Sequence, residues 1–248
     1  MKEQESIITA FEEMAPRYEK LMNSELHRFW GWSYDEFVNT LLSMMHVREK
    51  GVILDVATGT SYIPARLLQN HNELGQVIGL DITFKMLQFG QKKIMGLPNF
   101  TRMSMVCASA MRMPLADQSI DMVLCGLATH HMDVTVLLSE MKRVLKYNGD
   151  ISIADVGGSR FWKNPIIKMV IRILAFIYFF ITENKSRAWA EASALTNIRT
   201  AEEWQFALKG AGFKETIVSP LKSRRFWAPN PLIIHAKKNR RKQHGKIR

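Results

Sequence analysis

The chain has 248 residues, of which 47% are hydrophobic and 23% are charged, and its 34 Lys and Arg against 23 Asp and Glu give a formal net charge of +11. This length is enough for one large domain with a buried core. The composition excludes an intrinsically disordered chain, a collagen-like repeat and a coiled coil, because the apolar, Gly and Pro contents are those of a globular protein.

The first 50 residues are predicted to be helical. Four apolar side chains between Ile7 and Met14 recur at helical spacing, and an aromatic-rich segment follows at residues 29–37. The N-terminal segment is polar and acidic and lacks the basic-then-apolar order of a secretory signal, so we expect a cytoplasmic protein. We interpret residues 1–50 as a helical lid on the domain that follows.

From residue 51 onward, predicted strands alternate with predicted helices. The strands are residues 51–57, 76–81, 103–108, 119–125, 150–155, 213–219 and 231–236. The helices are residues 61–70, 83–95, 137–145 and 201–211, and the turn at 147–149 is expected to end the third of them before the fifth strand. This alternation predicts right-handed βαβ units and a doubly wound, mostly parallel α/β domain over residues 51–236.

The chain has two cysteines. Cys107 and Cys125 lie inside apolar runs, so we expect buried core residues in a reducing compartment.

Residues 159–199 exceed an ordinary connection and are interpreted as an apolar helical insertion. Its longest stretch without a charge has 10 residues, too few to span a bilayer.

Lys168 and Arg172 lie four residues apart in this insertion, on one face of the expected helix. Three arrangements are compatible with that spacing. The helix can lie at a membrane interface, close over an apolar substrate, or be a core helix whose two bases reach out to water.

The basic charge is concentrated at the C-terminus. Residues 237–248 contain seven Lys and Arg and no acid, so this tail supplies +7 of the net +11. Such a tail is usually a solvated segment. The alternatives are attraction to an anionic membrane surface or to nucleic acid. We favour the membrane, and the protein is then cytoplasmic and peripheral to it.

In an open α/β sheet, ligands bind outside the carboxyl ends of the strands, so acids on the predicted strands are of interest. Asp55, Asp81 and Asp121 lie in or at the ends of three strands. The turn at 55–61 has one glycine and matches neither a dinucleotide fingerprint nor a P-loop. Asp81 comes 26 residues after Asp55, where a carboxylate can accept hydrogen bonds from two ribose hydroxyls. The pattern predicts a nucleoside ligand without a phosphate cradle.

The motifs around these acids resemble class I S-adenosylmethionine-dependent methyltransferases over residues 51–213. The matching segments are residues 54–60 for the first motif, 81–82 for the ribose and adenine, 109–110 beside the adenine amine, 113–123, and 143–149. The resemblance implies a seven-stranded Rossmann-like fold and S-adenosyl-L-methionine as cofactor. The binding residues it implies are Asp55, Ala57, Thr58, Gly59, Thr60, Asp81, Ile82, Ser109 and Ala110.

Three residues in or beside these motifs depart from the family pattern. Ala57 and Ser61 replace glycines, and Ser109 replaces an acid that would bind the adenine amine. Fewer contacts at these positions would weaken cofactor binding.

Within that family, the N-terminal segment resembles the ubiquinone/menaquinone-biosynthesis C-methyltransferases. The similar stretches are residues 14–18, Asn23, 27–30, the turn at 57–60, and 200–213. The quinone enzymes carry an Arg-Asn pair after the fourth strand, whereas residues 126–131 read Gly-Leu-Ala-Thr-His-His here. This difference leaves a quinone and another small lipophilic or aromatic acceptor both open, for methylation at carbon or oxygen.

The mechanism requires a nucleophile aligned behind an electrophilic methyl group, and a base to remove a proton. His130 and His131 follow the fourth strand and are the candidate catalytic residues, with His131 slightly preferred over a purely structural histidine. Tyr18, Asn23 and Trp30 either line the substrate side of the pocket or pin the N-terminal helix to the core.

Other activities fit the sequence less well. No Cys/His cluster predicts a metal site, and two core cysteines do not provide the thiolates that arsenite methylation needs. A non-catalytic cofactor-binding scaffold is the alternative from another class. A phospholipid or nucleic-acid methyltransferase fits the sequence less well than these two. For nucleic acid the reason is that residues 126–132 lack the Asn/Asp-Pro-Pro-Tyr/Phe motif of amino-methylating enzymes.

Overall fold

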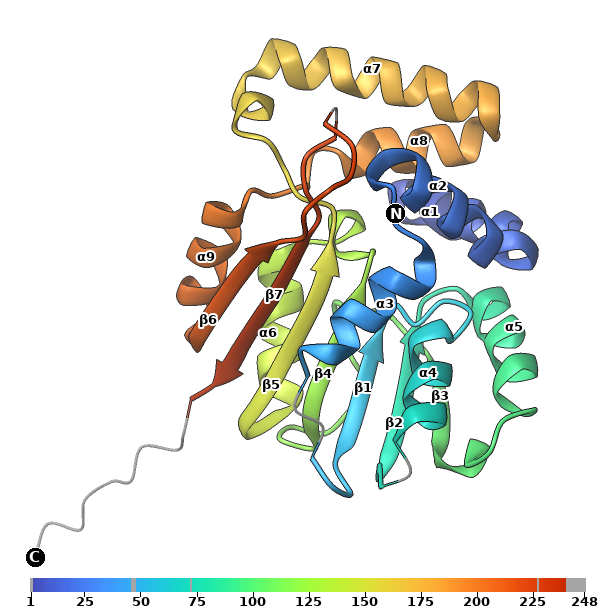
Figure 1. The fold of residues 1–248 in the computed structure, drawn as a ribbon, viewed down its shortest axis with the longest axis vertical. Helices are drawn as coiled ribbons and strands as arrows, with labels where there is room; N and C mark the ends of the chain where they lie inside the picture. The colour runs from blue at the N-terminus through green and yellow to red at the C-terminus, as the bar shows by residue number, and fades with distance from the viewer. Residues whose placement is uncertain (1, 46–47, 72, 227, 240–248) are drawn as a thin grey trace, which may run out of the picture.

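The carboxyl edge of one central sheet organises the molecule. The computed structural model describes residues 2–45, 48–71, 73–226 and 228–239. Within this part of the chain, seven strands pair in the order β3-β2-β1-β4-β5-β7-β6 (Figure 1). Strands β1 to β5 run parallel, β7 is antiparallel to β5, and β6 is antiparallel to β7. The predicted α/β class, with a doubly wound and mostly parallel seven-stranded sheet, is confirmed.

The elements follow the predicted order. The strands are β1 Val52–Val56, β2 Gln76–Asp81, β3 Met103–Cys107, β4 Ile120–Gly126, β5 Leu145–Asp155, β6 Phe213–Pro220 and β7 Leu232–Lys238. The α-helices are α1 Lys2–Met14, α2 Tyr18–Trp30, α3 Tyr34–Ser43, α4 Tyr62–Asn70, α5 Phe84–Ile94, α6 Val134–Val144, α7 Pro165–Thr182, α8 Lys185–Ala194 and α9 Ala201–Gly210. The short 3-10 turns are η1 Ala15–Arg17, η2 Phe100–Arg102, η3 Thr129–His131 and η4 Arg160–Lys163.

Alternation along the central strands builds two core layers, one on each face of the sheet. In β1, Leu54 and Val56 pack in a cluster with α6 and α9, whereas Ile53 packs in a second cluster with α3 and α4. Successive side chains of a strand point to opposite faces, so a strand that is apolar throughout serves both layers. This burial explains why β1 and β4 read as continuous apolar runs.

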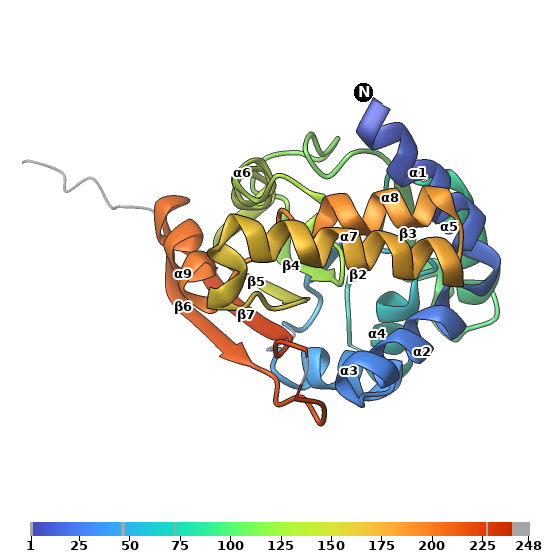
Figure 2. The same cartoon turned by 90° about the horizontal axis from the view of Figure 1, so that it is seen from above.

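Helices α1, α7 and α8 lie beyond the carboxyl ends of the parallel strands. Figure 1 shows α7 and α8 across the top of the sheet, and Figure 2 shows α1 alongside α8 in the view from above. Residues 159–199 thus extend from the end of β5 over the edge at which ligands bind in this class of fold.

Asp121 lies within β4, as expected, but near its start and therefore at the amino edge of the sheet, where its carboxylate accepts hydrogen bonds from Val52 N (2.9 Å) and Lys146 Nζ (2.7 Å). Two other expectations about the sheet were wrong. The predicted turn at 147–149 lies inside β5, which begins at Leu145 and carries an irregularity in its pairing with β4. Cys107 is exposed, because its edge strand has little cover, and Cys125 alone is a core residue.

The basic tail begins later than expected. Strand β7 continues through Lys238, so two of the seven basic residues belong to the sheet. Lys237 Nζ contacts Glu215 Oε2 at 3.0 Å, and Lys238 Nζ donates to the carbonyl of Leu145 at 2.6 Å. Residues 240–248 lie outside the described part of the chain.

Helix α7 is 18 residues long and largely exposed, so the core-helix interpretation of the insertion was wrong. By length and composition alone it could cross a membrane, and one such helix is weak evidence for a span. The segment was expected to be too short to span a bilayer because only its 10-residue stretch without a charge was counted. Lys168 Nζ and Arg172 Nε donate to the carbonyls of Thr196 (3.0 Å) and Ala192 (3.2 Å). These bonds tie α7 to the end of α8.

Candidate functional site

Two adjoining cavities occupy the carboxyl edge of the sheet. The first, here called the edge cavity, has a volume of about 460 Å³ and lies over the ends of β1 and β2. The second, the apolar cavity, has a volume of about 380 Å³ and lies between α2, α7 and α8. The side chains that line both cavities are Phe11, Tyr18, Leu127, His131 and Ala194. Two ligands could therefore meet at this boundary.

The turn after β1 forms the floor of the edge cavity. Ala57, Gly59 and Ser61 have φ values of 55°, 54° and 57°, in the left-handed region. The non-glycine residues Ala57 and Ser61 therefore keep the turn at a cost of roughly 1–2 kcal/mol each. Thr58 Oγ1 donates to Asp55 Oδ2 at 2.7 Å and holds the turn to the end of β1.

Asp81 joins this turn to the end of β2. Its Oδ2 accepts a hydrogen bond from Gly59 N at 2.9 Å, and its Oδ1 accepts one from Thr83 N at 2.8 Å. Burial raises the pKa of Asp81, and these amide hydrogen bonds act in the opposite direction. The carboxylate lines the edge cavity and keeps lone pairs for a ligand.

The predicted cofactor residues gather at the edge cavity in two layers. Those that line it are Ala57, Gly59, Asp81, Ile82, Ser109 and Ala110. Asp55, Thr58 and Thr60 are buried and do not line it. Asp55 lies in β1, and the two threonines belong to the turn and hold it in place; Thr60 Oγ1 donates to Glu19 Oε1 of α2 at 2.7 Å. Ser109 Oγ accepts a hydrogen bond from Met111 N at 3.2 Å and shapes the adjacent loop.

Asp55 provides a test of whether these residues suit a cationic ligand. Its Oδ1 is buried without a hydrogen-bond partner in the described structure. Burial raises the pKa of Asp55 to about 7, against the lowering effect of the Thr58 hydrogen bond. A nearby ammonium or sulfonium would favour the ionised carboxylate, so the site fits the cofactor that the motifs imply.

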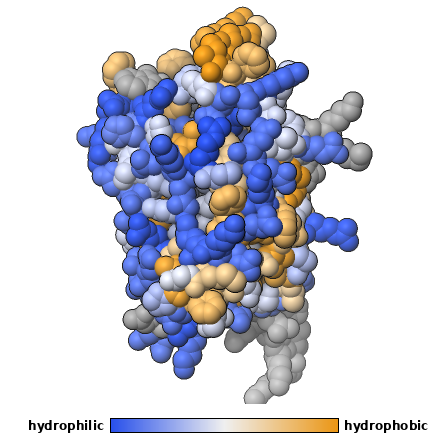
Figure 3. Space-filling model, turned by 90° about the vertical axis from the view of Figure 1, so that its right-hand side faces the viewer, coloured by the Kyte–Doolittle hydropathy of each residue, from blue (hydrophilic) through white to orange (hydrophobic). Residues whose placement is uncertain are grey.

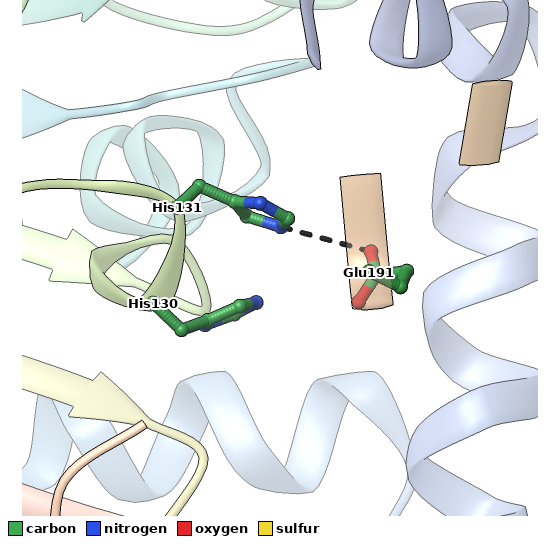
Figure 4. A group of neighbouring side chains, drawn as sticks. All are labelled: His130, His131 and Glu191. Carbon is green, nitrogen blue, oxygen red and sulfur yellow. Dashed lines mark ion pairs between the residues drawn. The ribbon is translucent and has the colours of Figure 1, made fainter. Parts of the chain in front are cut away.

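Two histidines on η3, directly after β4, extend toward Glu191 of α8 (Figure 4). His130 Nδ1 lies 2.6 Å from Asp155 Oδ1 at the end of β5. Burial alone would lower the pKa of His130, but the Asp155 carboxylate outweighs it and raises that pKa. His131 Nε2 lies 3.6 Å from Glu191 Oε1, and burial together with the charge on His130 lowers the pKa of His131. His131 is therefore the neutral member of the pair.

A buried guanidinium stands beside the histidines. Arg187 Nη2 lies 3.1 Å from Glu25 Oε2 and 3.0 Å from Glu191 Oε1. Burial alone would raise the pKa of Glu191, but Arg187 and His131 hold it well below its usual range. Burial raises the pKa of Glu25 to about 7 despite Arg187. This polar cluster forms the inner end of an otherwise apolar cavity.

The same cluster contains donor atoms of a type that binds metal ions. One ligand atom from each of His130, His131 and Glu191 lies within 4.8 Å of the others. Arg187 already places a cation 3.0 Å from Glu191, and a second cation beside it would be repelled. We therefore assign the positive charge at this point to Arg187.

The predicted substrate residues separate in the structure. Tyr18 lines both cavities, and burial raises its pKa, so its hydroxyl remains protonated. Trp30 lines the apolar cavity and donates from Nε1 to the carbonyl of Pro229 at 2.7 Å. Asn23 is exposed and lines neither cavity; its Oδ1 accepts from Tyr34 N at 3.0 Å and joins α2 to α3. The substrate interpretation of Asn23 was wrong, and the pinning alternative describes it.

Sequence reasoning missed Asp155, Arg187 and Glu191. Asp155 could have been found, because it ends a strand as Asp55 and Asp81 do. Arg187 and Glu191 follow no motif, and only the fold of the insertion brings α8 over the histidines.

The Asp155–His130 pair should make stability depend on pH. The raised pKa of His130 contributes stability that is present below about pH 6.5 and is lost as the pH rises through the folded-state value. The lowered pKa of Asp155 contributes stability above about pH 4 that is lost on acidification. We expect Asp155→Asn to lower the free energy of unfolding by about 2 kcal/mol at pH 6 and by clearly less at pH 9.

Urea unfolding at the two pH values measures this difference. Asp117→Asn is the matched control, since Asp117 forms an exposed pair with Arg143 and should change stability by less than about 1 kcal/mol. An equal loss for Asp155→Asn at pH 6 and pH 9 would contradict a charged pair.

Known sequences of one family are similar to most of this chain. The ubiE/COQ5 methyltransferase family model matches residues 1–219. A demethylmenaquinone methyltransferase of Staphylococcus epidermidis is 27% identical over 226 residues, covering 86% of this chain and 87% of that protein. The ubiquinone/menaquinone biosynthesis C-methyltransferase UbiE of Geobacter sulfurreducens is 26% identical over 218 residues, covering 86% and 82%.

Solved structures show the same fold. A SAM-dependent methyltransferase from Aquifex aeolicus matches with a TM-score of 0.60 and 16% identity, covering 90% of this chain and 97% of that one. Geranyl diphosphate C-methyltransferase from Streptomyces coelicolor matches with a TM-score of 0.64 and 14% identity, covering 89% and 84%. The family match, which extends over most of the chain, and the nucleoside-type edge cavity agree: this protein is an S-adenosylmethionine-dependent enzyme of the ubiE/COQ5 methyltransferase family.

Proposed function

We propose that this enzyme transfers a methyl group to a ring carbon of a quinol-like lipophilic acceptor. The observation that carries the proposal is the meeting of a cofactor-type cavity and an apolar cavity at His131 and Tyr18. The relatives named for demethylmenaquinone and ubiquinone/menaquinone methylation support an aromatic acceptor of this class.

In this proposal the edge cavity holds the cofactor. The amide-anchored carboxylate of Asp81 accepts the ribose hydroxyls, Ile82 packs beside the adenine, and Ser109 and Ala110 close its far side. Asp55 faces the positively charged methionine part through the turn. S-adenosylmethionine supplies an electrophilic methyl group on a sulfonium, whose sulfur keeps the bonding electrons when the methyl leaves.

The apolar cavity holds the acceptor with its ring at the boundary. Tyr18 and Phe11 flank that boundary, and Trp30 with α7 surrounds the apolar remainder of the molecule. Because the reacting atoms must lie about 3–3.5 Å apart and in line, a fixed ring position is the main requirement. Phe11 packs edge-on against His131 with ring centroids 5.3 Å apart, which holds the imidazole at the boundary.

His131 acts as the base in this proposal. Its lowered pKa keeps it neutral near pH 7, so it can accept the proton of a ring hydroxyl and increase the electron density on the adjacent carbon. That carbon forms the new bond to the methyl group, then loses its own proton to restore the aromatic ring, while the oxygen regains a proton from His131. The reaction therefore releases one proton in total. Arg187 supplies positive charge near the oxygen while it is ionised.

The direct test combines the purified protein, S-adenosylmethionine and reduced demethylmenaquinol, with product analysis by mass spectrometry and NMR. A methyl group on the ring carbon would support the proposal. Methylation at oxygen would replace carbon with oxygen as the acceptor atom, and absence of methylated product despite cofactor binding would refute the substrate class.

We also propose that the enzyme works as a peripheral protein at an anionic membrane surface. The basic residues beyond β7 support this location, because anionic lipids attract basic segments by about 1 kcal/mol per residue near the surface. Deleting residues 240–248 should weaken binding to phosphatidylglycerol vesicles at low salt and leave cofactor affinity unchanged. Unchanged vesicle binding would make the segment a solvated tail.

A further inference from the structure

Helix α7 presents two different apolar faces. Ile171, Ala175, Tyr178 and Phe179 line the apolar cavity from above. The large apolar side chains exposed on the outside of α7 are Ile166, Ile167, Met169, Val170, Ile173, Ile177, Phe180 and Ile181. Leu174 belongs to both sets, since it lines the cavity and is 60% exposed. This one helix therefore separates the apolar cavity from the surroundings.

The two basic residues of α7 bond toward α8. Lys168 donates to the carbonyl of Thr196, just beyond α8, and Arg172, although exposed, donates from Nε to the carbonyl of Ala192. Figure 3 shows hydrophobic side chains gathered at the end of the molecule where α7 lies. Figures 1 and 2 show α7 as an outer ridge above α8. A convex apolar ridge with its two bases to one side suits the interface of a lipid bilayer, where long basic side chains reach the headgroups.

The boundary between α2 and α7 is closed by a few exposed polar contacts. Arg28 Nη1 donates to the hydroxyl of Tyr178 at 2.7 Å, and Arg17 Nη2 lies 2.6 Å from Glu183 Oε2. Phe29 packs edge-on against Tyr178, with ring centroids 5.9 Å apart, and also lines the apolar cavity. The exposed Arg28 contact is worth roughly 0–1 kcal/mol, so this part of the boundary can open at little cost, whereas the Glu183 side chain beside it is only 8% exposed.

We propose that the outer face of α7 lies in the interfacial layer of a lipid bilayer, and that the acceptor passes from the bilayer into the apolar cavity between α2 and α7. The inference rests on the proposed function, because only a lipophilic acceptor would be stored in the bilayer. The contacts that hold α7 to α8 keep the helix lying on the bilayer rather than crossing it. Lipid covers the exposed face in this proposal, and Leu174 connects that face to the cavity because it belongs to both.

The test is the double variant Ile173→Glu/Ile177→Glu, which places two carboxylates on the outer face and leaves the cavity lining intact. The control is Phe206→Glu, because Phe206 of α9 is 81% exposed and lies away from α7. Binding is measured by flotation with vesicles of phosphatidylcholine and phosphatidylglycerol. Burial of two Ile side chains contributes roughly 3 kcal/mol, so the double variant should bind about 100-fold more weakly, and the control should bind as the wild type does.

Turnover with two acceptors separates membrane access from chemistry. For long-tailed demethylmenaquinol embedded in the vesicles, the double variant should show a KM at least tenfold higher with little change in kcat. For a short-tailed demethylmenaquinol in solution, both constants should stay within twofold of the wild type.

Each other outcome counts against the inference in its own way. Wild-type vesicle binding by the double variant would overturn the membrane assignment. Conversion of a wild-type dimer to a monomer in sedimentation would make the outer face of α7 a contact between two copies. An equal loss of turnover with the long-tailed and the short-tailed acceptor would mean that the two substitutions disturb the active site rather than membrane access. If the wild type methylated neither acceptor, the proposed function would fail, while vesicle binding would still report on α7.

Discussion

Replacing His131 with alanine should lower kcat by roughly 10²–10³-fold, because the hydroxyl proton of the acceptor would lose its base. Affinity for S-adenosylhomocysteine should stay within twofold of the wild type, since the hydrogen-bonded anchors of the edge cavity are Asp81 and the turn after β1. Turnover with the reduced acceptor and calorimetry with S-adenosylhomocysteine measure the two quantities separately.

The pH profile distinguishes a base from a structural residue. A base must be unprotonated, so wild-type kcat should rise with pH along a limb whose midpoint lies below about pH 6.5, because the pKa of His131 is lowered. This acidic limb should disappear in His131→Ala. His130→Gln is the neighbouring control: it should retain the limb, displaced toward higher pH, because a positive charge that lowers the pKa of His131 is gone. Undiminished kcat in both variants would remove the base assignment from this loop.

Replacing Asp81 with alanine should weaken binding of S-adenosylhomocysteine by roughly 100-fold. Hydrogen bonds to a charged group contribute about 1.5–3 kcal/mol each, so two lost ribose contacts amount to about 3 kcal/mol or more. The variant also releases Gly59 N and Thr83 N, which hold the turns after β1 and β2 in place. Calorimetry measures the dissociation constant, and circular dichroism checks that the variant is folded.

Asp121→Ala is a matched control for this effect. Asp121 is also an acid on a central strand, but it lies at the amino edge of the sheet, where it bonds Val52 and Lys146. Its replacement can lower stability, but the affinity of folded protein for S-adenosylhomocysteine should stay within twofold. A dissociation constant for Asp81→Ala within threefold of the wild type would mean that another group binds the ribose.

Much of the cofactor side of the site was predictable because it depends on short-range order. Parallel strands end at a common edge, so the spacing of Asp55 and Asp81 places both acids there without knowledge of any distant contact. Asp121 also lies in a predicted strand, but near the start of it, and so belongs to the other edge of the sheet. The position of an acid along its strand therefore decides whether it can reach a ligand at the carboxyl edge.

The acceptor side was only partly predictable, because its residues come together over long separations. His130 and Asp155 are 25 residues apart, and Arg187 meets Glu25 across 162 residues of chain. No local pattern marks such pairs. The N-terminal match to the quinone enzymes indicated Tyr18 and Trp30 at the cavity, but it included Asn23, whose side chain faces α3 instead.

By itself, the sequence determined the α/β class, the strand and helix order, the S-adenosylmethionine cofactor and the family, since each depends on local hydrophobic periodicity and on short motifs in order. The tertiary structure alone decided the buried cluster of Arg187, Glu191 and the two histidines, and the two faces of α7. A helix that is apolar on nearly all sides has no periodic signal to separate its inner from its outer face. Only the packing of α8 beneath it shows which side covers the cavity and which side is left exposed.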